Sequence, residues 1–331
     1  MSSLITQIMN PESVNINFSK SFLFLLLGIS LFIVTCTKDK DPEEVRKESL
    51  ARELAGDISA DSLQSYIVWM EGLGTRFALA DNHRDVALSI LRKFKMLGYV
   101  NSRLDSFVLD RVYHDISYHQ WQYNVIATLE GTTFPDSICI VGAHYDDNLR
   151  SGDPFAVTPG ANDNGSGVAA ALELARVFRK NNFSSLNTIE FIAFGAEELG
   201  LYGSKAYAAQ ASGSSKKIKM MLNNDMIAYE PSTGPSGWIV DIKDYDNSHE
   251  LRREAERMCT NFTSLDFKND NSYNQQSDSY PFFELGYKAL FFFSDKMDPE
   301  YHSLNDRSVN CNFAYCREIV KISCALLVYN N

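Results

Sequence analysis

Between residues 41 and 98 the apolar positions recur every three or four residues, a spacing that predicts α-helices. Three segments each open on an acidic residue and close on glycine, which are the usual start and stop signals of a helix. They are 41–56 (DPEEVRKESLARELAG), 61–74 (DSLQSYIVWMEGLG) and 81–98 (DNHRDVALSILRKFKMLG). In the third segment Val86, Ile90, Phe94 and Leu97 fall on one helical face. We therefore expect this part of the chain to be helical.

After residue 98 short apolar runs alternate with further helical patterns. Strands are predicted at 102–110, 122–131, 137–146, 188–196, 218–228 and 237–243, and within 280–294. Helices are predicted at about 165–180, 203–211, 248–259 and 313–329. This alternation indicates an α/β protein, and the apolar runs 138–141, 189–194 and 289–293 indicate strands buried on both faces. The predicted fold is a three-layer α/β/α arrangement, with a mostly parallel, mixed central sheet covered by helices on both faces.

The first 36 residues differ from the rest. An uncharged apolar run, 21–35, follows Lys20 and is shorter than a membrane span. It ends at Cys36 in the letters IVTC, which resemble a bacterial lipobox except for Thr35, where Ala, Gly or Ser is usual. We expect a signal peptide over residues 1–36, lipidation of Cys36, and export to the cell envelope, facing the periplasm or cell surface. A plain membrane anchor or an uncleaved signal is the alternative, and Met9 is an alternative start.

Composition narrows the functional classes. The chain has 331 residues and a net charge of −11, which argues against general nucleic-acid binding because that role needs a basic face. An apolar content of 45% provides for a large core, so folding requires neither disulfides nor a structural metal. Of the six cysteines, Cys139 lies in an apolar run and is expected to be buried. Cys311 and Cys316 are candidates for pairing, which spacing alone does not decide.

Histidine and carboxylate side chains gather where the predicted strands end. The positions at strand ends or in the adjacent loops are His144, Asp146, Asp163, Glu197, Glu198, Asp225 and His302. Ligands of α/β sheets bind at the carboxyl ends of strands, and zinc takes imidazole and carboxylate ligands. A purely structural explanation would need several unrelated causes, such as helix capping by Asp163. We therefore predict a metal site. The remaining histidines have polar neighbours and are expected at the surface: His83, His114, His119 and His249.

Six motifs carry a family resemblance. They are GAHYD, GANDNGSGVAAALELAR, FIAFGAEELGLYGSKAYA, LNNDMIAY, SDSYPF and YHSLND. In this order they resemble the two-zinc aminopeptidases of peptidase clan MH, which also holds glutamate carboxypeptidases and glutaminyl cyclases. The resemblance runs from about Asp85 to the C-terminus. It implies a zinc peptidase catalytic domain over residues 85–331, preceded by a linker and N-terminal helices over 37–84.

The resemblance also implies two Zn²⁺ per chain and a role for each site residue. The implied ligands are His144 and Asp225 for one zinc, Glu198 and His302 for the other, and Asp163 as the bridge. Glu197 would be the general base that takes a proton from water and returns it to the leaving amine. Asp146 would hold the imidazole of His144 in place. The implied activity is hydrolysis of the N-terminal peptide bond of peptides, with membrane contact only through the lipid anchor.

Substrate contacts are less closely defined by the motifs. Asp278 occupies another family position near the metals, and Ser279 stands where the family usually has His. Tyr273 and Tyr280 are candidates for stabilising the tetrahedral intermediate, and Met226 and Tyr301 for lining a pocket. Close in sequence to the candidate ligands the arginines are Arg150 and Arg307, which favours recognition of an amine over a carboxylate.

Two alternative functions stay open. One is a glutaminyl-cyclase-like acyltransferase that uses one zinc, and the other is a non-catalytic, receptor-like relative. Cyclases carry Trp before the last histidine, where this chain has Tyr301, and the residues NGSG after Asp163 match the peptidases. Both features favour hydrolysis, and the complete set of ligand positions argues against the receptor-like alternative.

Overall fold

The structure is a computed structural model that describes residues 41–214, 216–232 and 234–331. The expected signal peptide, Cys36 and the alternative start at Met9 lie outside the described residues and stay predictions. Across the described ranges we find no helix with both the length and the hydrophobicity to cross a bilayer. Pro42–Asn331 forms one compact unit.

The secondary structure follows the predicted alternation. In the described part of the chain the helices are α1 (Pro42–Gly56), α2 (Ala60–Glu71), α3 (His83–Met96), α4 (Ser166–Lys180), α5 (Tyr202–Ser212), α6 (His249–Phe262), α7 (Tyr280–Glu284) and α8 (Phe313–Tyr329). The strands are β1 (Arg103–Tyr113), β2 (Ile116–Leu129), β3 (Phe134–His144), β4 (Asn187–Phe194), β5 (Lys217–Asn224), β6 (Ile239–Lys243), β7 (Asp266–Lys268) and β8 (Ala289–Ser294).

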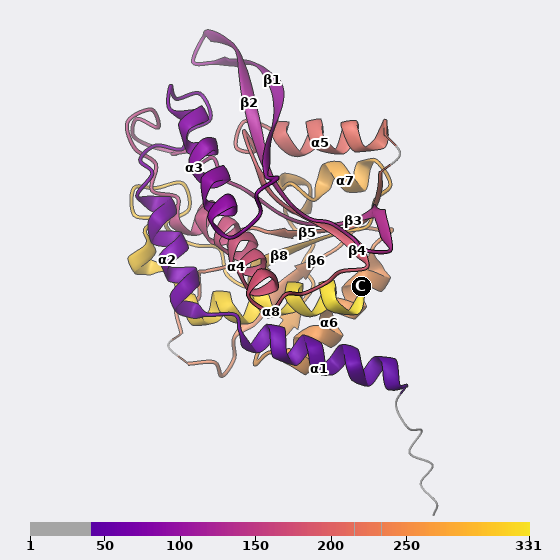
Figure 1. Cartoon of the computed structure of the whole chain (residues 1–331). Coiled ribbons are helices and arrows are strands. Elements are labelled where there is room, and N and C mark those ends of the chain that lie inside the picture. Colours follow the sequence, from indigo (N-terminus) through magenta and orange to yellow (C-terminus); the bar gives the residue numbers. More distant parts are fainter. Residues whose placement is uncertain (1–40, 215, 233) are drawn as a thin grey trace, which may run out of the picture. The chain divides into compact units, whose positions relative to one another are not determined.

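The strands form one mixed sheet in the order β1-β2-β4-β3-β5-β8-β6-β7 (Figure 1). The central strands β4, β3, β5 and β8 run parallel to one another. The pairs β1–β2, β2–β4 and β6–β8 are antiparallel, and β6–β7 is parallel. The predicted mixed α/β sheet is therefore confirmed, and the carboxyl ends of its central strands meet at one edge.

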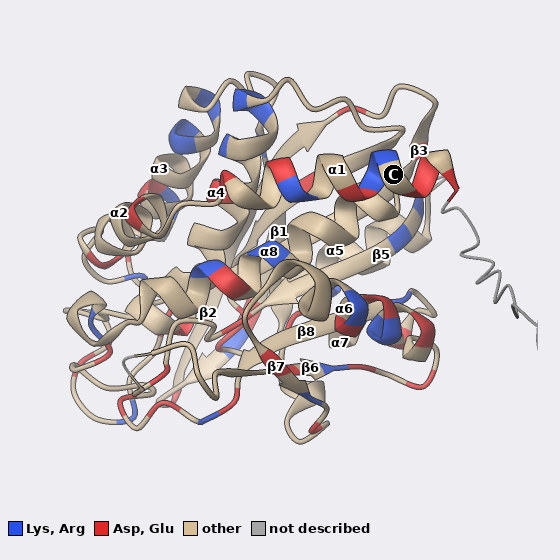
Figure 2. Ribbon diagram, turned by 90° about the horizontal axis from the view of Figure 1, so that it is seen from below, with Lys and Arg blue, Asp and Glu red and all other residues tan. Residues whose placement is uncertain are grey.

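Helices cover both faces of this sheet because its strands are apolar on both sides. On β3, Val141 packs in a core shared with α1, α2, α3, α4, α6 and α8, whereas its neighbour Ile140 packs in a second core with α5 and α7. Figure 1 shows α5 and α7 on one side of the sheet and α4 and α8 on the other. Acidic and basic residues are interspersed along the outer helices α1 and α6 (Figure 2).

Some element boundaries differ from the prediction. The strand β5 ends at Asn224, four residues before the predicted end, because the chain turns sharply at Met226, where φ is +53°. The strand β2 begins at Ile116, and its residues 116–126 pair with the whole of β1, so that the two strands form a long hairpin. The three-residue strand β7 was not predicted. The expected boundary at residue 85 falls inside α3, and the N-terminal helices α1 and α2 pack on α8 and α4.

The cysteines and the remaining histidines occupy mostly the expected places. Cys139 is buried, and the cysteines of the described ranges, including Cys311 and Cys316, are free thiols. His114, His119 and His249 are exposed. His83 is half-buried and hydrogen-bonds through both ring nitrogens to the backbone oxygens of Ala80 and Trp121, so it joins α3 to the hairpin.

Candidate metal centre

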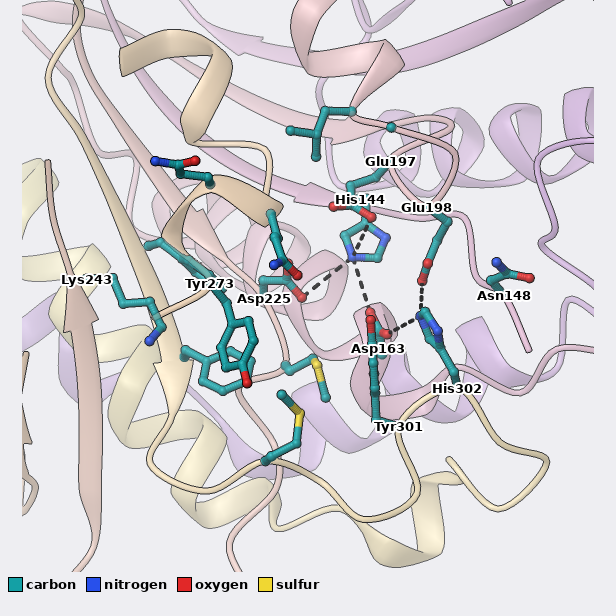
Figure 3. Close-up of a pocket in the computed structure, with 18 of the residues that line it drawn as sticks. His144, Asn148, Asp163, Glu197, Glu198, Asp225, Lys243, Tyr273, Tyr301 and His302 are labelled. Carbon is teal, nitrogen blue, oxygen red and sulfur yellow. Dashed lines mark hydrogen bonds and ion pairs between the residues drawn. The ribbon is translucent and has the colours of Figure 1, made fainter. Parts of the chain in front are cut away.

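The candidate ligands lie together at the carboxyl edge of the sheet, in one pocket (Figure 3). His144 is the last residue of β3, and Asp225 directly follows β5. Asp163 lies in the turn Ala161–Gly165 that leads into α4, Glu197 and Glu198 follow β4, and His302 lies in the loop after β8. The rule that ligands bind where parallel strands end therefore places these residues correctly.

Sharp turns at the strand ends direct these side chains into the pocket. Ala196, Met226 and His302 adopt left-handed backbone conformations, with φ of +57°, +53° and +56°. Such conformations are costly for residues other than glycine and concentrate at functional sites. The turn at Ala196 ends β4 immediately before Glu197 and Glu198. Because the chain is no longer extended there, the two neighbouring carboxylates can face the same site.

One group of ligand atoms surrounds the Nε2 atom of His144. It lies 3.2 Å from Asp163 Oδ1 and 3.5 Å from Asp225 Oδ1, and both carboxylates are buried. The other ring nitrogen, Nδ1, donates a hydrogen bond to the backbone oxygen of Asp146 at 3.0 Å. This bond places a proton on Nδ1 and turns Nε2 towards the carboxylates, the orientation that a metal-ligating imidazole needs.

A second group surrounds the Nε2 atom of His302. It lies 2.8 Å from Glu198 Oε1 and 3.2 Å from Asp163 Oδ2. The two oxygens of Asp163 thus face two different imidazoles, which is the arrangement expected of a bridging carboxylate. Candidate metal-ligating groups are accordingly found for His144, Asp163 and Asp225, and for Asp163, Glu198 and His302.

Glu197 belongs to a third candidate metal-ligating group, together with His144 and Glu198. The imidazole that each glutamate faces distinguishes the two. Glu198 is in direct contact with His302, whereas the ion pair of Glu197 among the described residues is a longer one, with Oε2 3.9 Å from His144 Nε2. Burial raises the pKa of Glu197 well above its ordinary value, and the adjacent Glu198 carboxylate raises it further.

The donor set fits a divalent metal. Asp163, Glu197, Glu198 and Asp225 bring four carboxylates together with two imidazoles, and an excess of buried carboxylates is costly unless cations compensate it. Among the described residues, the neighbour of the buried Asp163 Oδ2 atom is His302 Nε2 at 3.2 Å, without a well-aligned hydrogen bond between them. Imidazole nitrogens and carboxylate oxygens are also the ligands that zinc takes in catalytic sites. The residues present can therefore hold metal ions.

Buried polar side chains behind the ligands hold them in place. Ser277 Oγ donates a hydrogen bond to Asp225 Oδ2 at 2.5 Å and itself accepts one from Asn223 Nδ2 at 2.5 Å. The carboxylate of Asp306 accepts hydrogen bonds from the backbone N–H groups of Asn162 and Asp163, at 2.7 and 2.9 Å. Both supporting residues belong to motifs of the sequence, SDSYPF and YHSLND, but their contacts are long-range and no local pattern indicates them.

Asp146, the expected partner of the His144 imidazole, is buried next to the site and contacts the ring. The contact with the His144 ring comes from its backbone oxygen, and the carboxylate Oδ1 lies 3.9 Å from Nδ1. Instead, the carboxylate accepts hydrogen bonds from the backbone N–H groups of Glu197 and Glu198. Asp278 is fully buried, and within the described residues its carboxylate has the Ser204 hydroxyl as a neighbour but no well-formed hydrogen bond. Burial raises the pKa of Asp278 to about 7.

The pocket has a volume of about 730 Å³. Tyr273, Met226 and Tyr301 line it, as expected, whereas Tyr280 does not and instead packs against Tyr245 and Phe283. Arg150 is a further lining residue. Arg307 instead forms an ion pair with Glu71. Pocket residues that sequence reasoning did not identify are Asn148, Lys205, Lys243, Gln275, Gln276, Phe291, Phe293 and Met297.

Comparisons with known proteins agree with this geometry. Residues 124–327 match Peptidase family M28. Leucine aminopeptidase 1 of Ajellomyces capsulatus is 26% identical over 300 residues, which cover 86% of this chain and 75% of that protein. The solved structure of BSAP, a zinc aminopeptidase from Bacillus subtilis, is similar with a TM-score of 0.68 and 19% identity, over 82% of this chain and 95% of that one.

The same fold occurs in a glutaminyl cyclase of Bacteroides thetaiotaomicron, with a TM-score of 0.65 and 15% identity, over 83% of this chain and 99% of that one. At these identities the structural matches establish the fold, while the family match covers more than half of the chain and includes all seven candidate site residues. The chain therefore belongs to peptidase family M28, as the resemblance of its motifs implied.

Proposed function

We propose that this protein is a zinc aminopeptidase that hydrolyses the peptide bond after the first residue of peptides. The observation that carries the proposal is the position of Asp163, whose two carboxylate oxygens face the imidazoles of His144 and His302. This geometry suits two zinc ions that share one carboxylate, with Asp225 completing one ligand group and Glu198 the other. Zinc bound there would lower the pKa of a bound water and polarise the scissile carbonyl.

A side chain of the protein takes the proton from water and passes it to the leaving amine. Glu197 lines the pocket, is buried, and has a pKa raised well above the ordinary value, which suits a carboxylate that takes a proton from water and then releases it to the leaving amine. The backbone hydrogen bond to Asp146 fixes the peptide unit that carries Glu197. Tyr273 and Tyr301 reach the same pocket and are available to contact the substrate.

The cellular setting is also a proposal. The apolar run 21–35 and the lipobox-like Cys36 support export and attachment to a membrane of the cell envelope through a lipid. Peptides in the periplasm or at the cell surface would then be the substrates.

A paired assay tests the activity against the cyclase alternative, which the shared fold keeps open. The purified protein is reloaded with zinc, its zinc content is counted per chain, and it is given leucyl p-nitroanilide and a peptide that begins with glutamine. We expect release of p-nitroaniline and of free glutamine, with about two zinc ions per chain. Formation of the cyclised peptide without hydrolysis of either substrate would overturn the proposal.

A further inference from the structure

Two strands at the side of the sheet form one wall of the pocket. In the antiparallel pair β6–β8, Lys243 lies opposite Phe291 and Asp241 lies opposite Phe293. Because side chains alternate across a strand, these four residues share one face of the sheet. The intervening residue Phe292 points to the other face and packs in the core. An ion pair therefore lies beside two aromatic rings on the pocket side of these strands.

Lys243 is a buried cation on this wall. The residue is 2% exposed and lines the pocket, with its Nζ atom 5.9 and 5.4 Å from the ring centroids of Phe291 and Phe293. The ammonium group donates one hydrogen bond to Asp241 Oδ2 at 2.8 Å and another to the backbone oxygen of Asp270. An ammonium group has three donors. In the described part of the chain these two bonds leave one N–H of Lys243 for a group that enters the pocket.

Within the described residues, the counter-ion of Lys243 is Asp241, and Lys243 shares it with Lys268. The Oδ1 atom of Asp241 accepts a hydrogen bond from the backbone N–H of Asp270 at 2.9 Å. Its Oδ2 atom also lies 3.9 Å from the ammonium group of Lys268, which pairs with Asp295 at 2.8 Å. The carboxylate of Asp241 therefore interacts with two ammonium groups. An additional acceptor at Lys243 would strengthen this network.

The position of Lys243 in the pocket determines how far a substrate side chain must extend to bring an acceptor to it. Figure 3 shows Lys243 on the side of the pocket away from Glu198 and His302, and in this view Tyr273 lies between Lys243 and the candidate ligands. Methionine and phenylalanine side chains, among them Met226, line the pocket together with Tyr273 and would contact methylene groups. A substrate side chain that starts near the candidate ligands would have to extend past Tyr273 to end at Lys243.

We propose that Lys243 selects peptides whose first residue carries a long side chain ending in an oxygen acceptor, namely glutamate or glutamine. The proposal rests on the proposed aminopeptidase function, because it assigns the pocket wall to the side chain of the first residue. The unused N–H of Lys243 donates to the carboxylate or amide oxygen of that side chain, while the aromatic rings beside it cover the methylene groups.

An anchoring role is the competing explanation for Lys243. Through Asp270 it holds the start of the loop that carries Tyr273. Loss of an anchor would change the hydrolysis of all substrates by a similar factor, whereas loss of a selective contact changes their ratio. The ratio of kcat/KM values for two substrates therefore separates the two roles.

The test uses glutamyl, glutaminyl and leucyl p-nitroanilides with the zinc-loaded protein and the variants Lys243→Met and Lys268→Met. Lys268 is the matched control, because it shares Asp241 but does not line the pocket. We expect Lys243→Met to lower kcat/KM for the glutamyl and glutaminyl substrates, relative to leucyl, by about tenfold or more, as for loss of a hydrogen bond to a charged group. Lys268→Met should leave these ratios within about twofold.

A double variant controls for misfolding of Lys243→Met. Asp241→Asn/Lys243→Met removes both charges, leaves no unpaired buried carboxylate, and should show the same fall in the ratios. Unchanged ratios in both Lys243 variants, or an equal fall in Lys268→Met, would overturn the proposal. A wild-type protein that cleaves the leucyl substrate but neither of the other two overturns only this inference. A wild-type protein that cleaves none of the three overturns the aminopeptidase function as well.

Discussion

The Oδ1 atom of Asp146 accepts a hydrogen bond from the backbone N–H of Glu197 at 2.9 Å. The second carboxylate oxygen accepts one from the N–H of Glu198 at 3.2 Å, and the backbone oxygen of Asp146 accepts one from the ring of His144. The end of β3 is thereby tied to the turn after β4. One buried residue orients three side chains of the candidate metal centre.

This relationship predicts that Asp146→Asn lowers kcat/KM by roughly 10–100-fold, the usual effect of removing a residue that orients metal ligands. An asparagine side chain has one oxygen and one NH₂ group, so it cannot accept both backbone hydrogen bonds. The exposed Asp136 provides a matched control through Asp136→Asn. If the two variants have the same kcat/KM and zinc content, the carboxylate of Asp146 has no positioning role.

The two neighbouring glutamates should differ when each is changed to glutamine. Glu198→Gln weakens a ligand that contacts His302 at 2.8 Å, so we expect loss of zinc by elemental analysis. Glu197→Gln should keep the wild-type zinc content and lower kcat by about 10²–10⁴-fold, because an amide cannot take a proton from water. Full activity of Glu197→Gln would contradict its role as the base. Loss of zinc from Glu197→Gln but not from Glu198→Gln would reverse the two roles.

Ser277 should contribute to metal affinity although it contacts Asp225 on the carboxylate oxygen that faces away from His144. Its hydroxyl group binds Asp225 Oδ2 and so leaves Oδ1 directed at His144. Ser277→Ala is expected to weaken zinc binding by about 10–100-fold, measured by competition with a chelator. Ser279→Ala is the control, since Ser279 is equally buried but bonds to Tyr245. Equal affinities in the two variants would exclude a role for the Ser277 hydroxyl.

Much of the candidate ligand set could be predicted because most of its members lie next to apolar strands that the sequence reveals. His144, Glu198 and Asp225 follow closely after strand ends, and parallel strands bring their ends together. Asp163 and His302 lie in the loops beyond two strand ends, so their approach to the same edge depends on loop conformations that the strand positions do not determine.

Other features escaped prediction for physical reasons. In the strand IVDIK, Asp241 and Lys243 alternate with apolar residues, which is also the pattern of a strand with one solvent-exposed face. Only the pairing of β6 with β8 shows that the polar face adjoins a pocket. The contacts of Ser277 and Asp306 depend on tertiary packing between segments far apart in the chain. Local patterns cannot reveal such contacts.

Asp244 links α6 to the segment that precedes Tyr273. Its buried carboxylate predicts how the stability of the protein depends on pH. Its side chain is 1% exposed and accepts hydrogen bonds from His249 at 2.7 Å, Arg252 at 2.9 Å and Asn271 at 3.1 Å. Burial raises the pKa of Asp244, but the hydrogen bonds from His249, Asn271 and Arg252 outweigh it and hold the pKa below the ordinary value of 3.8. Because Asn271 lies two residues before Tyr273, which lines the pocket, the contact with Asn271 also supports one side of the pocket.

A carboxylate whose pKa is lowered on folding stabilises the native state at pH values above its unfolded pKa, and this stabilisation is lost as the pH falls through the lower folded pKa. Asp244→Asn should therefore reduce the free energy of unfolding by about 1–3 kcal/mol at neutral pH, as for hydrogen bonds to a charged group. The difference from wild type should persist down to about pH 4 and shrink below it. Urea unfolding at several pH values measures this, with Asp246→Asn at the exposed neighbouring position as control. A difference between wild type and Asp244→Asn that stays constant into the acid range would show that the ionised carboxylate is not the stabilising form.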